Sequence, residues 1–412
     1  MNKERIIKIL TFITNVLVAL YLGLFHILSI SQSINKICLL FMFLICLLTF
    51  LKRERFIIPK EFLFLSAFYV FALLSLLWSP EPSVGYRLCF RTIPLLLVMT
   101  LLLYNFVRQN KNPEVLVCAI YMTGIVLTVA MVVVYGGFRS LVGFMKTGLR
   151  LGGLINNEND VGMGLAMASV VAFYLFLNSR WWHSVFSFVF AVMAMATGSR
   201  KVVLILVLGG FLTVVSLLDF SKGKGKKNCA IIGGAIAFVG VCFALMFKIS
   251  AFSSIKSRFL TMLSSLSNKV GGDGSTDTRM EMIKVGWEAF KSHPFGGVGV
   301  GTSSLLGFGT YLHNNFIEIL ASLGGVGFFL YYASYGVSFL RTFPLFKNYN
   351  KMAFLAAIIN ICWLVVQVGL VSYETKDTYY YLVLLSVLSG IQRDDMENEK
   401  QNKVKRSFVL VD

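Results

Sequence analysis

The sequence has 412 residues, of which 57% are hydrophobic and only 14% are charged, and its mean hydropathy is +0.75. A soluble globular protein has about a quarter of its residues charged, so this composition excludes a water-soluble protein. It also excludes a disordered chain, a coiled coil, collagen and a disulfide-stapled secreted module. The net charge is +18, and the seven cysteines show no spacing typical of a disulfide framework or a zinc site. We therefore expect a polytopic, all-α membrane protein.

Apolar runs of about 17–25 residues predict about twelve membrane-spanning helices. In chain order they lie at 10–29, 33–51, 61–78, 92–107, 115–135, 161–178, 181–197, 202–218, 229–247, 314–340, 352–371 and 379–391. The first run follows Lys3, Arg5 and Lys8 and leads directly into the second run. We interpret it as an uncleaved anchor and not as a signal peptide.

The distribution of Lys and Arg predicts that both termini are cytoplasmic, because most cations fall in loops on that side. Residues 1–247 then hold the first nine helices, and 248–312 form one large extracytoplasmic loop that contains short helices. Residues 313–391 hold the last three helices, and 392–412 form a solvated, disordered cytoplasmic tail.

The large loop contains a predicted helix with recognisable ends. Thr278 and Glu281 fit a capping box, which predicts that the helix starts there and places Arg279 in its first turn. His293-Pro294 predicts the end of this helix. The glycines that follow, up to Gly301, predict a flexible or tightly turning connector.

Cations also gather in the predicted outer loops, where few Lys and Arg are expected. They are Arg87, Arg91, Arg139, Lys146, Arg150, Arg200 and Lys201. Net positive charge at an outer mouth suits an anionic ligand, for which diphosphate is the natural candidate in a membrane. The alternative for any single arginine is snorkelling to the interface. Arg200 lies in a short turn between two apolar runs, close to the membrane surface, where a charged residue is a functional candidate.

His313 opens the tenth predicted span at its outer end. Asn314 and Glu318 follow it and share one helix face. An imidazole with polar neighbours can accept a proton from a hydroxyl near neutral pH. A helix cap or an ordinary surface residue is the alternative interpretation of His313.

These segments resemble one known family, the membrane-embedded O-antigen ligases and oligosaccharide repeat-unit polymerases of bacterial envelopes. The resemblance rests on TGSR at 197–200, on Arg279 followed by His293-Pro294 and the glycines, and on HNNFIEILASLGGVGF at 313–328. A less close match is RLGGLINNEND at 150–160, where Glu158 replaces the proline that the family usually has between two asparagines.

The resemblance implies a GT-C-like fold and transfer of a glycan from a polyprenyl diphosphate to an acceptor hydroxyl. The reaction would invert the anomeric centre, need no metal or cofactor, and take place on the outer side of the bacterial cytoplasmic membrane. By motif match His313 is the base, and Arg200 and Arg279 stabilise the departing diphosphate. Further substrate-binding candidates, chosen from charge placement or from their position next to His313, are Arg150, Arg87, Arg91, Asn314 and Glu318.

Polymerisation of repeat units is favoured over ligation to lipid A-core, because it does not require a host that makes lipopolysaccharide. A secondary transporter or lipid-glycan flippase is a more distant alternative, since polar residues collect at the outer rim and not near the bilayer midplane. A non-catalytic scaffold is another. The expected partners are a polyprenyl-diphosphate-linked oligosaccharide, membrane lipid and other envelope polysaccharide assembly proteins, with no nucleic acid.

Overall fold

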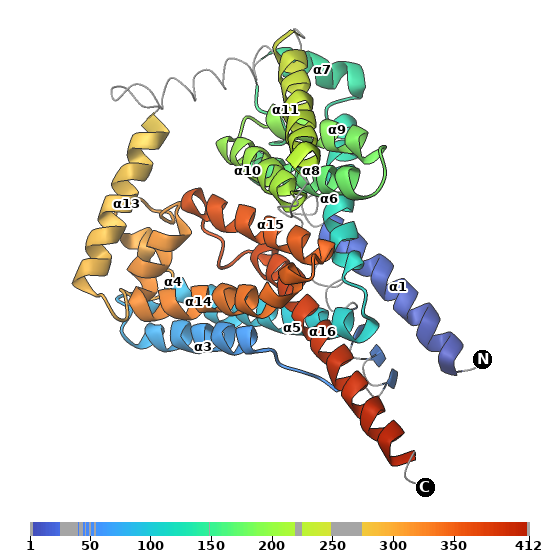
Figure 1. The fold of residues 1–412 in the computed structure, drawn as a ribbon. Coiled ribbons are helices and arrows are strands. Elements are labelled where there is room, and N and C mark those ends of the chain that lie inside the picture. The colour runs from blue at the N-terminus through green and yellow to red at the C-terminus, as the bar shows by residue number, and fades with distance from the viewer. Residues whose placement is uncertain are drawn as a thin grey trace.

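The computed structural model describes residues 3–24, 40, 44–45, 47–48, 51–52, 55–147, 149–218, 225–248 and 274–409. Within these ranges all regular elements are helices, in agreement with the all-α prediction (Figure 1). Helices suit an apolar chain because they satisfy every interior backbone N–H and C=O without water.

The described residues form fourteen helices and four short helical turns. The first half of the chain forms α1 (Lys3–Leu24), α3 (Lys60–Leu74), α4 (Pro82–Arg87), α5 (Ile93–Asn110), α6 (Glu114–Val134), α7 (Phe138–Lys146) and α8 (Glu158–Asn178). The second half forms α9 (His183–Ala196), α10 (Arg200–Ser216), α11 (Gly225–Lys248), α13 (Gly274–Ser292), α14 (Asn315–Lys347), α15 (Lys351–Val366) and α16 (Lys376–Val409). Short turns of tighter or wider helix are η1 (Ser75–Leu77), η2 (Leu88–Thr92), η4 (Thr302–Leu305) and η5 (Gln367–Gly369).

Six described segments are long and apolar enough to cross a membrane. They are Lys60–Leu77, Pro82–Asn110, Glu114–Val134, Glu158–Asn178, Asn315–Lys347 and Lys351–Gly369. Every other predicted span overlaps a described helix, except 33–51, most of which lies outside the described residues. The chain is therefore a helical membrane protein, and the total of twelve spans stays a prediction.

α8 is the most enclosed candidate span, with 78% of its apolar window buried. Small side chains on this helix let its neighbours approach closely. At Gly162 a Cβ atom would lie 2.4 Å from Oγ1 of Thr197 and 2.8 Å from Cγ2 of Val202. The absence of a side chain at Gly162 therefore allows the end of α9 and the start of α10 to pack directly on α8.

A second packed group contains α3, α14 and the start of α16. Phe68 of α3 contacts Tyr331 of α14 with ring centroids 5.3 Å apart, and it meets the Tyr373 ring at 6.0 Å. All three side chains are buried. This packing brings the segment that precedes α16 against α14.

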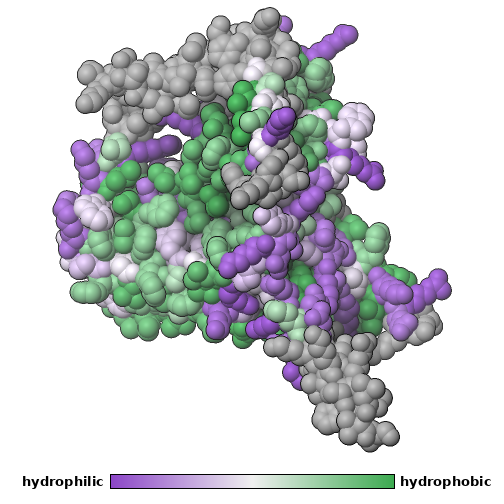
Figure 2. All heavy atoms as spheres, viewed as in Figure 1, coloured by the Kyte–Doolittle hydropathy of each residue, from purple (hydrophilic) through white to green (hydrophobic). Residues whose placement is uncertain are grey.

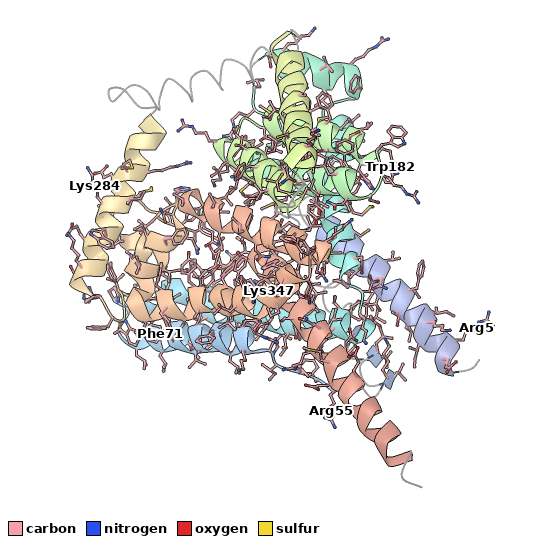
Figure 3. The ribbon with its side chains drawn as sticks, in the orientation of Figure 1. Arg5, Arg55, Phe71, Trp182, Lys284 and Lys347 are labelled. Atoms are coloured by element: carbon pink, nitrogen blue, oxygen red, sulfur yellow. The ribbon has the colours of Figure 1, made fainter. Side chains whose placement is uncertain are left out.

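Polar residues lie at two opposite sides of the molecule. Both termini point to one side, and α13 lies across the other (Figure 1). Figure 2 shows a broad apolar surface between polar groups at these two sides. In Figure 3, Arg5 and Arg55 lie towards the side of the termini and Lys284 lies on α13. Which of these two sides is cytoplasmic and which is outer stays a prediction.

The C-terminal tail differs from the prediction. α16 continues to Val409, so the prediction of a disordered tail is wrong for residues 392–409. Nη1 of Arg108 pairs with Oδ2 of Asp394 at 2.7 Å, and Lys111 pairs with Asp395. These ion pairs tie the first turn of the tail to the end of α5 and favour continuation of the helix.

The loop helix also begins earlier than predicted. α13 starts at Gly274, so Thr278 is an interior residue of the helix and the predicted capping box is wrong. Arg279 consequently lies in the second turn, and not in the first turn, where the helix dipole disfavours a cation most.

Candidate active site

The turn between α9 and α10 carries Arg200. The Thr197 hydroxyl donates to a carbonyl oxygen one turn back in α9 at 2.7 Å, and Gly198 reverses the chain with a φ of 66°. Arg200 is the first residue of α10 and is exposed, whereas Lys201 is half-buried. Both cations precede the predicted span 202–218, so they lie at the start of a helix that is predicted to cross the membrane.

Arg150 connects this turn with the start of α8. Its Nε donates to the carbonyl oxygen of Thr197 at 2.9 Å, and its Nη2 donates to Oδ1 of Asn159 at 3.0 Å. The N–H of Leu151 donates to the last residue of α9 at 3.1 Å. Arg150 therefore holds the Arg200 turn in place and contributes its own positive charge there.

His313 lies in the segment that leads into α14, with a φ of 54°. Hydrogen bonds fix its neighbours on both sides. The N–H of Leu312 donates to Oε2 of Glu318 at 2.9 Å, and the Ser303 hydroxyl donates to the other oxygen of this carboxylate. Oδ1 of Asn314 caps α14 by accepting from two backbone N–H groups of its first turn, at 3.0 and 3.1 Å. These contacts hold the left-handed backbone at His313.

The connector after α13 enters a break in α14. Gly324 interrupts the helix with φ 64° and ψ −167°. Four backbone hydrogen bonds join the connector to this break: Val298 N to Ala321 O (2.9 Å), Gly299 N to Ser322 O (2.9 Å), Gly325 N to Pro294 O (2.7 Å) and Val326 N to Phe295 O (3.3 Å). They supply partners for the groups that the break leaves without helical bonds. The predicted connector is thus tightly turned, and it fixes α13 against α14.

Two nearby cations lower the pKa of His313. Burial lowers the pKa of His313 below its usual value, and the charges of Arg279 and Lys201 lower it further. Burial also lowers the pKa of Lys201 to about 8, and Arg279 adds to this shift. Asp160 opposes the shift and Arg150 supports it. The site therefore has a positive potential that disfavours additional protons, keeps the imidazole neutral near pH 7 and suits an anionic ligand.

A second set of charged and titratable groups borders the first. Burial raises the pKa of the Glu374 carboxyl, in the loop between α15 and α16, and the charge of Arg87 lowers it. The Tyr311 ring centroid lies 4.4 Å from that of His313. Burial raises the pKa of Tyr311, and the charges of Asp160 and Glu374 raise it further. Tyr311 therefore contacts His313, and its pKa also responds to the charge of Glu374.

The predicted site residues do not all lie in one cluster. His313 and Arg279 belong to one cluster, with Arg150 beside the Arg200 turn. Arg87 borders the Glu374 loop, and Arg91 is an exposed residue of η2. Asn314 and Glu318 form hydrogen bonds that hold the backbone around His313.

Lys201, Tyr311 and Glu374 were not predicted as site residues from the sequence. Lys201 was counted only as one of the outer cations. A signal for Glu374 exists in the sequence, because it is an acidic residue in the last predicted outer loop.

A scan against protein families gives one relevant finding. Residues 185–332 match the family model described as O-antigen ligase. This part of the chain is therefore similar to the O-antigen ligase family. The match confirms the family predicted from the motifs, and its range includes the Arg200 turn, Arg279 and His313 but not Arg150. A comparison with curated proteins gave no match.

Proposed function

We propose that this protein transfers a glycan from a polyprenyl diphosphate to an acceptor hydroxyl at the outer face of the bacterial cytoplasmic membrane. The observation that carries the proposal is the placement of His313 near the cations Arg279 and Lys201, whose charges lower its pKa. The O-antigen ligase domain supports a reaction of this type.

His313 is the proposed base. As the acceptor oxygen attacks the anomeric carbon, its proton moves to the imidazole, and the bond between that carbon and the diphosphate oxygen breaks. Direct displacement inverts the anomeric centre. The lowered pKa of His313 leaves the imidazole free to accept a proton at neutral pH. An anionic donor that binds beside Arg279 would offset the cationic charge and make the imidazole a stronger base.

Arg200 and Arg279 are the proposed groups that receive the charge of the departing lipid diphosphate. Guanidinium groups remain charged at all relevant pH values and bind phosphate oxygens through several N–H groups. Fixed cations of this kind stabilise charge that develops in the transition state. Arg150 supports them by holding the turn that carries Arg200.

The remaining predicted residues receive lesser roles in this proposal. Asn314 and Glu318 position His313 through the backbone. Arg87 and Arg91 contribute positive charge on the approach to the site. We propose no metal ligand, and the described residues contain no group of three or more His, Cys, Asp and Glu side chains placed to hold a metal ion.

Polymerisation of lipid-linked repeat units is the preferred form of the reaction. The same chemistry would serve a ligase that transfers the finished glycan to lipid A-core, and the description of the matching family favours this second candidate. The two differ in the acceptor and not in the base or the leaving group.

The proposal is tested by supplying the purified protein with short oligosaccharides linked to a polyprenyl diphosphate and separating the products by size. A ladder of products indicates a polymerase, and product that forms only with lipid A-core indicates a ligase. His313→Ala should abolish product, whereas His293→Ala, which changes an exposed histidine at the end of α13, should retain activity. Absence of transfer by the wild-type protein with both acceptors would contradict the proposal.

A further inference from the structure

We propose that Lys201 is a third diphosphate-binding cation, which contacts the same lipid diphosphate as Arg200 and Arg279 from the first turn of α10. The inference rests on the proposed function, because the ligand is the donor assumed there. No motif of the sequence analysis distinguishes Lys201 from the other outer cations.

The position of Lys201 is fixed from two directions. It follows Arg200 in the first turn of α10, whose start packs on α8 through Val202 and Gly162. Its aliphatic chain reaches η5, where a Cβ atom at Gly369 would lie 3.4 Å from Cε of Lys201. The side chain therefore extends from α10 towards the end of α15.

That end of α15 is joined to the His313 segment by hydrogen bonds. Gln367, two residues before Gly369, accepts from Nδ2 of Asn315 at 3.1 Å and from the Tyr332 hydroxyl at 2.9 Å. Asn315 begins α14, two residues after His313. The Lys201 side chain is thus packed against a segment that is hydrogen-bonded to the segment carrying the base.

The surroundings of Lys201 contain more positive than negative charge. Charged and titratable groups face Lys201 from other elements: Arg279 of α13, Asp160 of α8, Arg150 before α8 and His313 before α14. Arg200 is its neighbour in α10. Asp160 supplies the one carboxylate in this set. Cations crowded together in this way are stabilised by an anionic ligand, and a diphosphate carries enough charge to balance several of them.

Lys201 differs from the two arginines in one measurable property. Burial lowers its pKa to about 8, so in the ligand-free protein its ammonium loses charge as the pH rises above that value. Arginine stays charged throughout this range. A diphosphate is fully ionised above about pH 8. A loss of binding at higher pH therefore reflects a change in the charge of the protein and not of the ligand.

The experiment measures binding of geranylgeranyl diphosphate to the full-length protein in nanodiscs between about pH 7 and pH 9.5. Wild type should lose affinity above about pH 8. Lys201→Arg should bind with unchanged affinity across the range. Lys201→Met should bind about tenfold more weakly at pH 7, with no pH step, because it lacks one charge-assisted hydrogen bond. Lys291→Met, at an exposed lysine of α13 that pairs with Glu288, should behave as wild type.

Equal affinity of Lys201→Met and wild type at pH 7 would overturn the inference, as would a pH step that persists in Lys201→Arg. The Lys201→Arg variant keeps the test valid if Lys201→Met fails to fold. The result of this binding experiment can be distinguished from the result of the glycan-transfer experiment. A wild-type protein that shows the pH step but transfers no glycan would refute the enzyme proposal alone, and one that transfers glycan without the step would refute only this inference.

Discussion

Gly297 lies at the junction of the connector with α14, and its replacement by alanine offers a sharp test of that junction. Gly297 has a φ of 64°, and a Cβ atom there would lie 2.3 Å from the carbonyl carbon of Ser322 and 2.4 Å from the nitrogen of Leu323. Ordinary contacts of a Cβ atom begin at 3.4 Å. Gly297→Ala must therefore move the connector away from α14 by about 1 Å, since both obstacles are backbone atoms.

The structure provides a matched control at Gly309. Its φ is 65°, almost the same as at Gly297, but a Cβ atom there meets nothing within 4 Å. Both alanine variants incur a left-handed backbone cost of about 1–2 kcal/mol. Only Gly297→Ala also strains the two hydrogen bonds that Val298 and Gly299 donate to α14. At about 0.5–1.5 kcal/mol for each bond, the two variants should differ in stability by about 1–3 kcal/mol.

Thermal unfolding measures the loss of stability, and glycan transfer measures the loss of site geometry. Gly297→Ala should lower the Tm more than Gly309→Ala, and it should reduce transfer by about 100-fold, because a displacement of about 1 Å separates Arg279 from His313. Gly309→Ala should retain most of the activity. Equal losses in the two variants would show that the connector does not set the geometry of the site.

Three further predictions concern the surroundings of the base. Asn315→Asp removes the amide that donates to Gln367, so transfer should fall while the protein still inserts, and Asn315→Gln should not restore it. Glu318→Ala removes the acceptor that holds the backbone before His313, and it should lower kcat with little change in donor KM; a pure change in KM would contradict this role. Arg279→Gln removes a charge that lowers the pKa of His313, so that pKa should rise. The acid limb of the residual kcat/KM profile should then move to higher pH, and a shift to lower pH would refute the assigned electrostatics.

The sequence predicts the helices well because a local pattern of residues indicates each one. Uninterrupted apolar runs give most helix positions, and His293-Pro294 marks the end of α13 correctly. The motif residues His313 and Arg279 were also assigned to one site before the structure brought them together. Apolar runs and short motifs need no information about distant residues, so they can be interpreted from one sequence.

The features that the sequence did not predict depend on contacts between distant residues. Arg150 was expected to bind substrate from its charge alone, but its hydrogen bonds to Thr197 and Asn159 appear only when α8 and α9 are packed. The break at Gly324 is specified by hydrogen bonds to a connector about 25 residues earlier. The tail helix is stabilised by the ion pair of Asp394 with α5, which a search for local patterns cannot find.

The central claim is that the cluster of His313 and its cations faces the outside of the cytoplasmic membrane. Its most direct test is labelling of single cysteines in a cysteine-free variant, with a membrane-impermeant maleimide applied to intact spheroplasts. Lys284 of α13 and Trp182 at the start of α9 lie at opposite sides of the molecule in Figure 3, and Trp181 beside the latter is exposed. The account predicts that Lys284→Cys is labelled from outside and Trp181→Cys only after permeabilisation. Labelling of Trp181→Cys from outside, with Lys284→Cys protected, would contradict it.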